Sequence, residues 1–215
     1  NVRNVLRFVL QTPGQNGLVP NYEAHLELGA PVALEAAEDG IVLLKNVASV
    51  LPLDSDESVD VFGIGSYLFY PNGLGCADIN KPYTINLLEG MKREGIKINQ
   101  TVDRYYNKFI EAEQVQLYET NTKTWKNWFF GYKMPQEAIL RPFFIEKRAA
   151  DCDKAIITIA RNIGEALDRD YVEGEYLLSP QERDMISAVC DIFHKAGKKV
   201  IIVVNTGSPI ELGRE

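Results

Sequence analysis

The chain has 215 residues, of which 46% are hydrophobic and 25% are charged, and this composition excludes disordered, collagen-like and coiled-coil proteins. The length suits one domain or slightly more. Thirty acidic residues against 23 basic ones give a net charge of −7, so we expect no nucleic-acid partner.

The first part of the chain is predicted to hold two helices and two strands. Apolar residues recur at helical spacing in residues 1–10, and the Gly- and Pro-rich segment that follows predicts a linker up to Tyr22. Alanine, leucine and glutamate dominate a second helix over residues 25–39, with Gly40 as its C-terminal stop. Continuous apolar runs then predict strands that are covered on both faces, over residues 41–46 and 59–65.

The middle of the chain is less regular. Glycines and prolines predict a long loop over residues 67–82, followed by a helix that begins near Thr84 and ends at Gly95. A short strand is expected over 96–102 and a polar and aromatic helical region over 103–130. The aromatic stretch from Trp125 to Tyr132 suits a buried turn or a surface patch, and the sequence does not assign its role.

The last third has the clearest pattern. We expect helices over 135–150 and 179–197 and strands over 154–160 and 200–205. Ser179, Pro180 and Glu182 form the start signal of the second of these helices, a capping box with proline in the first turn. Alternating strands and helices predict a parallel sheet, whose ligands bind at the carboxyl ends of the strands. The loops after Ile64, Ala160 and Asn205 are therefore the expected location of the chemistry.

The cysteines, histidines and apolar runs indicate which kinds of metal, disulfide and membrane site the chain is expected to lack. The three cysteines are widely spaced without a CxxC motif, so we expect buried thiols and neither a disulfide framework nor a zinc site. His25 and His194 lack the spacing of a metal pair and are expected to be structural. The longest apolar runs are too short to cross a bilayer, and we expect no membrane partner. The sequence does not assign a compartment, although a cytoplasmic location is favoured over a secreted one.

The loop over residues 161–178 is the most polar connection of the chain, with seven charged side chains beside two glycines. A carboxylate next to a glycine at the end of a strand can face a cleft, as a general acid must. The alternative is a solvated loop held together by Asp168 and Arg169, and spacing alone favours this alternative.

A second glycine-rich segment, GIGSYLFYPNGLG over residues 63–75, partly matches a dinucleotide-binding turn. The fingerprint fails at its third glycine, where Leu68 stands, and we expect a loop to follow instead of a helix N-terminus. Structural turns that require positive φ angles are favoured, with a sugar-facing loop as the second interpretation. Signatures of a serine nucleophile and of a P-loop are absent from the sequence.

The order of several segments carries a family resemblance. They are EAAEDGIVLLKN with VLPL, VDVFGIGS, YTINLLEGMKREG, KAIITIARNIGEALDRD, LLSPQERDMISAV and KKVIIVVNTGSPIEL. In this order the segments resemble the C-terminal domain of glycoside hydrolase family 3, the β-glucosidase-like enzymes. The resemblance covers residues 25 to 212 and implies a flavodoxin-like, three-layer α/β sandwich with a mostly parallel central sheet.

The resemblance also implies a shared active site. In the family, a TIM-type barrel domain supplies an aspartate nucleophile and the sandwich domain supplies a glutamate acid/base, which matches Glu165 here. Ala166 replaces the usual glycine after it. Substrate-binding or loop-shaping roles are implied for the neighbouring motif residues Gly164, Asp168 and Arg169. The sugar-facing interpretation of the second glycine-rich segment gives such roles to Gly73 and Gly75 as well. No metal or cofactor is expected.

The family pattern suggests a domain organisation and leaves two function classes open. Residues 1–24 are expected to be a linker and the tail of a preceding barrel, and residues 25–215 an incomplete domain that is truncated on its C-terminal side. The first class is a retaining β-glycosidase acting on a β-linked glucoside or xyloside, with this chain inactive alone. The alternative is a non-catalytic carbohydrate-binding or scaffold module. A flavodoxin-like nucleotide binder is disfavoured, because the phosphate fingerprint fails.

Overall fold

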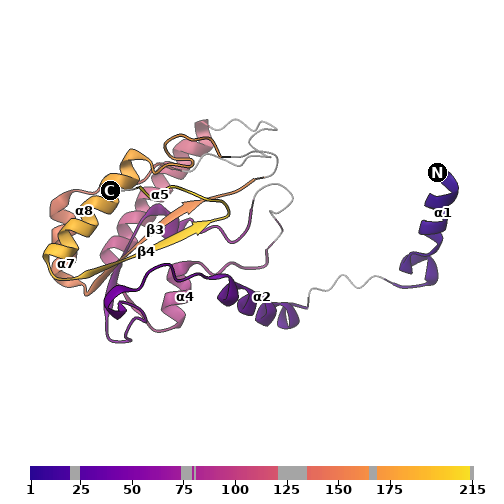
Figure 1. The fold of residues 1–215 in the computed structure, drawn as a ribbon, viewed down its shortest axis with the longest axis horizontal. Helices are drawn as coiled ribbons and strands as arrows, with labels where there is room; N and C mark the ends of the chain where they lie inside the picture. Colours follow the sequence, from indigo (N-terminus) through magenta and orange to yellow (C-terminus); the bar gives the residue numbers. More distant parts are fainter. Residues whose placement is uncertain (20–24, 74–78, 80, 121–134, 165–168, 214–215) are drawn as a thin grey trace. The chain divides into compact units, whose positions relative to one another are not determined.

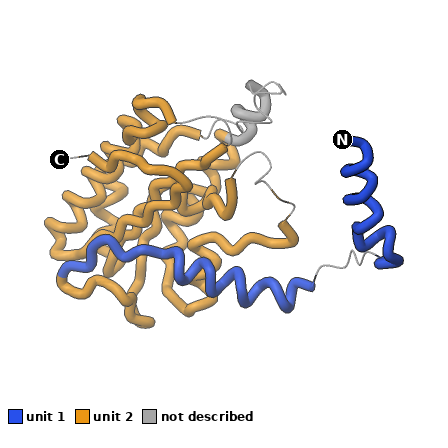
Figure 2. The backbone as a smooth tube through the Cα atoms, turned by 45° about the vertical axis from the view of Figure 1, so that its right-hand side comes forward, with its two compact units in different colours: residues 1–47 blue, residues 48–215 orange. Residues whose placement is uncertain are grey.

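The computed structural model describes residues 1–19, 25–73, 79, 81–120, 135–164 and 169–213, with the backbone alone for 114–120. The chain forms two compact units, residues 1–47 and 48–215, which Figure 2 shows in two colours. No helix within the described ranges is both long and apolar enough to cross a membrane.

The first unit contains the two predicted helices. Helix α1 spans Val2–Leu10, a 3₁₀ turn spans Pro13–Asn16, and α2 spans Leu26–Gly40. The predicted strand over residues 41–46 is wrong, because this segment has no regular structure and its apolar side chains are exposed. An apolar run becomes a strand only where a neighbouring strand pairs with its backbone, and no such pairing occurs among the described residues here.

The second unit is built on a four-stranded parallel sheet in the order β2-β1-β3-β4, within the described residues. The strands are β1 (Ser58–Phe62), β2 (Lys97–Ile98), β3 (Lys154–Arg161) and β4 (Lys199–Thr206). Strands β3 and β4 pair along their whole length, from Lys154 opposite Lys199 to Arg161 opposite Thr206. Their carboxyl ends therefore lie side by side (Figure 1).

Helices cover both faces of this sheet. They are α3 (Ile64–Tyr67), α4 (Leu87–Arg93), α5 (Gln100–Thr120), α7 (Pro142–Asp151) and α8 (Pro180–Lys195). On one face, Phe62 and Ile157 pack with Phe193 in a core that α5, α7 and α8 line; on the other, Val61 and Ile156 pack against α4. The predicted three-layer α/β sandwich with a parallel sheet is confirmed.

Several element boundaries differ from the prediction for local reasons. The strand expected over 59–65 ends at Phe62, and α3 follows it directly, which corrects the expectation that a loop follows. Gly63 makes this turn with φ +87°, and a Cβ atom there would lie 2.5 Å from the Thr158 carbonyl oxygen, so only glycine fits. The strand expected over 96–102 is short because Asn99 Oδ1 accepts the Thr101 N–H at 2.8 Å, at the start of α5.

The last third agrees best with its prediction. Helix α8 has the predicted capping box, in which Ser179 Oγ accepts the Glu182 N–H and Glu182 Oε2 accepts the Ser179 N–H. The helix expected over 135–150 begins only at Pro142, because residues 135–141 have no regular structure. Cys152 is the buried thiol that the sequence predicts, Cys190 is half-buried, and Cys76 lies outside the described residues.

Candidate functional site

The segments that follow β1, β3 and β4 meet at the carboxyl edge of the sheet. The side-chain amide of Asn205, near the end of β4, makes two hydrogen bonds with the backbone of Tyr70: Oδ1 accepts its N–H at 2.8 Å, and Nδ2 donates to its carbonyl oxygen at 3.1 Å. Because β3 lies between β1 and β4, these bonds hold the segment after β1 across the end of β3.

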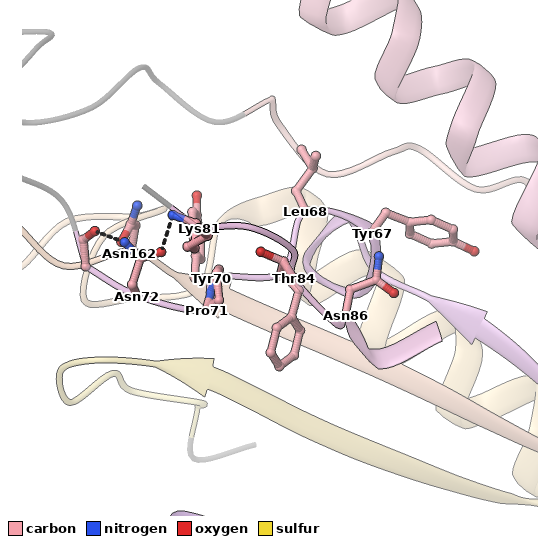
Figure 3. A pocket seen from close by; sticks show the side chains of 11 residues that line it. Tyr67, Leu68, Tyr70, Pro71, Asn72, Lys81, Thr84, Asn86 and Asn162 are labelled. Carbon is pink, nitrogen blue, oxygen red and sulfur yellow. Dashed lines mark hydrogen bonds between the residues drawn. The ribbon is translucent and has the colours of Figure 1, made fainter. Parts of the chain in front are cut away.

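A pocket of about 420 Å³ opens at this edge (Figure 3). Its side chains come from the segment after β1, from the approach to α4, and from the first residue after β3; they are Tyr67, Leu68, Phe69, Tyr70, Pro71, Asn72, Gly73, Lys81, Thr84, Asn86 and Asn162. Amides, hydroxyls and one ammonium group provide hydrogen-bond donors and acceptors beside aromatic rings. This mixture suits a neutral, hydroxyl-rich ligand.

Two polar residues of the pocket are joined to each other. Lys81 Nζ donates to Asn72 Oδ1 at 2.9 Å and to the Ile79 carbonyl oxygen at 3.3 Å, and Asn72 Nδ2 donates to the Gly73 carbonyl oxygen at 3.2 Å. Burial raises the pKa of Tyr70 to about 12, so its hydroxyl is protonated near neutral pH. The pocket wall therefore presents an ammonium group, an amide and a protonated phenol.

Arg161, the last residue of β3, ties the following loop to α8. Its guanidinium group binds both carboxylate oxygens of Glu182 at 2.6 Å, and its Nε donates to the Glu175 carbonyl oxygen at 3.0 Å. Both side chains of the ion pair are about nine-tenths buried, where such a bidentate pair is strong. Since Glu182 also caps α8, one network joins the strand end, the loop and the helix start.

Arg169 holds the base of the same loop together. One terminal nitrogen donates to the carbonyl oxygen of Asn162, at the other end of the segment, and Nε donates to Ser208 Oγ, beyond β4. Its other terminal nitrogen lies 3.5 Å from a carboxylate oxygen of Glu175. Burial lowers the pKa of the guanidinium, yet Arg169 stays charged at every physiological pH. Residues 162 and 169 are therefore linked directly, which closes the base of this loop.

Glu137 is a buried carboxylate that the sequence did not reveal, and it binds the first residue of α3. Glu137 Oε2 accepts the Ile64 N–H at 2.8 Å, and Oε1 accepts from the Tyr106 hydroxyl at 3.0 Å and from the Ala138 N–H at 2.9 Å. Burial raises the pKa of Glu137. This residue fixes the start of α3, which leads into the pocket wall at Tyr67. No local sequence pattern could have predicted this role of Glu137, because Glu137 and Ile64 are 73 residues apart in the chain.

Comparison with known proteins decides the family. The model of the glycosyl hydrolase family 3 C-terminal domain matches residues 41–215. The chain belongs to glycosyl hydrolase family 3. The resemblance found in the order of the sequence segments is confirmed.

Similar proteins in the family carry β-glucosidase names. The chain is 30% identical to β-glucosidase A of Butyrivibrio fibrisolvens over 223 residues, which cover 92% of this chain and 24% of that protein. It is 29% identical to a β-glucosidase of Ruminococcus albus over 182 residues, covering 84% of this chain and 18% of the relative. The chain thus spans about a quarter or less of these relatives.

Solved family structures share the fold. The structure of β-glucosidase 3B from Thermotoga neapolitana in complex with α-D-glucose matches with a TM-score of 0.85 and 34% identity, over 98% of this chain and 28% of that one. A β-glucosidase from Paenibacillus barengoltzii matches with a TM-score of 0.73 and 28% identity, over 90% of this chain and 20% of that one.

The structure of this family 3 domain places part of the predicted site. Gly73 lines the pocket, Gly164 is half-buried in the loop after β3, and Arg169 is at the base of this loop. Glu165, Asp168 and Gly75 lie outside the described residues, as does the aromatic stretch from Trp125 to Tyr132. The structure joins Arg169 to Asn162, two residues before Gly164, and places Gly73 in the neighbouring pocket.

Proposed function

We propose that this domain supplies the general acid/base of a retaining β-glycosidase, with Glu165 as the reacting carboxyl and a terminal β-linked glucoside or xyloside as substrate. The observation that supports this proposal is the position of the residues on either side of Glu165. Asn162 lines the pocket, and Arg169 is hydrogen-bonded to the Asn162 carbonyl oxygen at this same edge of the sheet. The β-glucosidase names of the relatives support the substrate class.

The chemistry needs a second carboxylate from outside this chain. Retaining glycosidases use one carboxylate as nucleophile and one carboxylic acid that protonates the leaving group, roughly 5–5.5 Å apart. We assign the nucleophile to an aspartate of a TIM-type barrel domain in the same parent protein. This assignment makes the chain inactive by itself, because an acid without a nucleophile cannot complete the double displacement.

The remaining motif residues have supporting roles in this proposal. Arg169 shapes the loop through its bond to Asn162, and we place Asp168 and Gly164 in the same loop-shaping group. Gly73 and Gly75 allow the backbone of the neighbouring segment to approach the sugar. The polar pocket side chains of Lys81 and Thr84 offer hydrogen bonds to sugar hydroxyls.

The test is the hydrolysis of two substrates by the full-length parent protein carrying Glu165→Ala. A natural disaccharide has a poor leaving group that needs protonation, so its rate should fall by about 10² to 10⁴-fold. An aryl β-glucoside with a good leaving group should lose far less in its first step. Added azide should restore turnover on the aryl substrate, because an anionic nucleophile needs no general base.

Glu173→Ala is the matched control, since Glu173 is a carboxylate of the same connection that forms an exposed ion pair with Arg183 at 2.6 Å. This control should leave both substrates near their normal rates. If Glu165→Ala also left both rates unchanged, the acid/base assignment would be wrong. Binding of the chain to soluble β-glucan without any effect on turnover would then favour the carbohydrate-binding module.

A further inference from the structure

The turn after β4 lies beside the exit of β3. Arg161 and Thr206 are the last paired residues of the two strands, so the chain leaves β3 and β4 at the same level of the sheet. The turn is held internally, because Thr206 Oγ1 donates to the Ser208 carbonyl oxygen at 2.6 Å and accepts the Ser208 N–H at 3.3 Å. Ser208 is thus fixed in place beside the loop that begins at Asn162.

One side of this turn packs against the start of the loop. A Cβ atom at Gly207 would lie 2.5 Å from Ile163 Cγ2 and 3.1 Å from Ile163 Cβ. These contacts are too short for any side chain larger than hydrogen. Ile163 therefore rests directly on the backbone of Gly207, and an added methyl group would displace the loop at this point.

The other side of the turn holds the end of the same loop. Ser208 Oγ accepts a hydrogen bond from Arg169 Nε, and Arg169 in turn binds the Asn162 carbonyl oxygen. Two adjacent residues of one turn thus contact Ile163, two residues before Glu165, and Arg169, four residues after it.

We infer that Gly207 and Ser208 are positioning residues for the acid/base Glu165, because they seat both flanks of its loop on the rigid end of the sheet. This inference rests on the proposed function. Proton transfer to a leaving group depends strongly on geometry, and a displacement of about 1 Å can cost up to about 10²-fold in rate. A loop seated on a strand end keeps its carboxyl in place better than a loop with free flanks.

The experiment compares Gly207→Ala and Ser208→Ala in the full-length parent protein, with the same disaccharide and aryl β-glucoside. We expect each variant to lower kcat on the disaccharide by about tenfold, and at least about threefold more than on the aryl glucoside. The basic limb of the pH–rate profile for the disaccharide should also move, since it reports the proton on the acid/base. A purely structural role would change both substrates alike and leave this limb in place.

Two controls match these substitutions. Gly90→Ala adds a methyl group inside α4, where the nearest atom is the Ile85 Cγ2 at 3.9 Å, and Ser187→Ala removes an exposed hydroxyl from α8. Both should leave the ratio of the two substrates unchanged. Ser208→Ala removes only one hydroxyl group, so it tests the inference even if Gly207→Ala folds poorly.

A double variant tests the contact itself. Ile163→Ala removes the Cγ2 atom that the new methyl group would meet, so Ile163→Ala with Gly207→Ala should recover most of the rate lost by Gly207→Ala alone. Additive losses, or equal losses on both substrates, would overturn the positioning role. Glu165→Ala separates the two proposals. If Glu165→Ala shows the acid/base pattern while the Gly207 and Ser208 variants show no difference between the substrates, only the positioning inference fails. If Glu165→Ala does not show the acid/base pattern, the proposed function fails.

Discussion

Two buried carboxylates of the sandwich domain, Glu182 and Asp60, differ in how their oxygens are partnered. At the carboxyl edge of the sheet, Arg161 binds both oxygens of Glu182. In the amino half, Asp60 of β1 lies beside the Cys152 thiol and within the electrostatic influence of Arg148. Neither Asp60 oxygen nor Arg148 Nε has a geometrically defined hydrogen-bond partner in the part of the chain that the structure describes. Burial raises the pKa of Asp60 to about 6.

The difference shows that burial alone does not decide whether a carboxylate stabilises the fold. A buried carboxylate whose oxygens have donors becomes strongly destabilising when one of these donors is removed, and a buried carboxylate that is charged without donors is already costly. The carboxyl edge, where Glu182 and Glu137 are fully engaged, is the edge that holds the pocket and the loop after β3. The carboxylates at this edge accept hydrogen bonds of defined geometry, whereas burial disfavours the charged form of Asp60 and raises its pKa.

The largest loss of stability is expected from breaking the Arg161–Glu182 ion pair. Arg161→Met should lower the free energy of unfolding by about 3–5 kcal/mol, because it leaves Glu182 buried without its partner. Urea unfolding followed by circular dichroism measures the loss. Arg183→Met is the matched control, since its ion pair with Glu173 has the same 2.6 Å distance but is half exposed, and it should cost less than about 1 kcal/mol. Equal losses for both variants would contradict the comparison.

Glu137→Leu should have the next largest effect. The substitution leaves the Ile64 and Ala138 N–H groups and the Tyr106 hydroxyl without this acceptor, at a cost of about 2–4 kcal/mol. Urea unfolding at neutral pH again provides the measurement. A variant as stable as the parent would show that Glu137 resembles Asp60, and that the carboxyl edge is not stabilised by its paired carboxylates.

Asp60→Asn tests the comparison by the pH dependence of the free energy of unfolding. Since the folded-state pKa of about 6 lies above the ordinary value of 3.8, the protonated carboxyl favours the folded state, and this advantage is lost as the pH rises through about 6. Asparagine does not titrate, so the stability of the variant relative to the parent should rise by about 2 kcal/mol between pH 4 and pH 7. Unfolding curves at the two pH values measure this change, and a pH-independent difference would refute it.

The smallest effect concerns a single hydrogen bond. Tyr106→Phe removes one donor to Glu137 in a site that keeps two others, so about 1 kcal/mol should be lost. Tyr105→Phe is the control, because its hydroxyl makes only a long, exposed contact of 3.5 Å to the Ile139 carbonyl oxygen. Thermal unfolding of the two variants should differ, and identical midpoints would place Tyr106 outside the supporting network.

Local signals predicted much of the fold. The capping box at Ser179 and the apolar run of β3 are encoded within a few neighbouring residues, and both elements formed as expected. The segment over residues 41–46 has an equally apolar run, but a strand needs a partner for its backbone, which no local pattern supplies. Likewise, α3 begins directly after Gly63 because this glycine packs on the Thr158 backbone, a contact between residues far apart in the chain.

The candidate site also has features that the sequence predicted and features that it did not. The sequence predicted that the connections after the strands carry the chemistry, because parallel strands share one carboxyl edge. It did not predict the partners of Arg161 or Glu137, which lie 21 and 73 residues away. The assignment of Glu165 stays a prediction, for which the kinetic comparison of the two substrates is the test.

The sequence by itself determined the family, the alternation of strands and helices, and the motif that contains Glu165, since each depends on the order and spacing of nearby residues. Only the tertiary structure decided that Gly207 and Ser208 lie against both flanks of this motif and that Asp60 is buried without a hydrogen-bonding donor of defined geometry in the described chain. The physical reason is that hydrogen bonding and close packing depend on distances in space, which a parallel sheet sets between segments far apart in sequence.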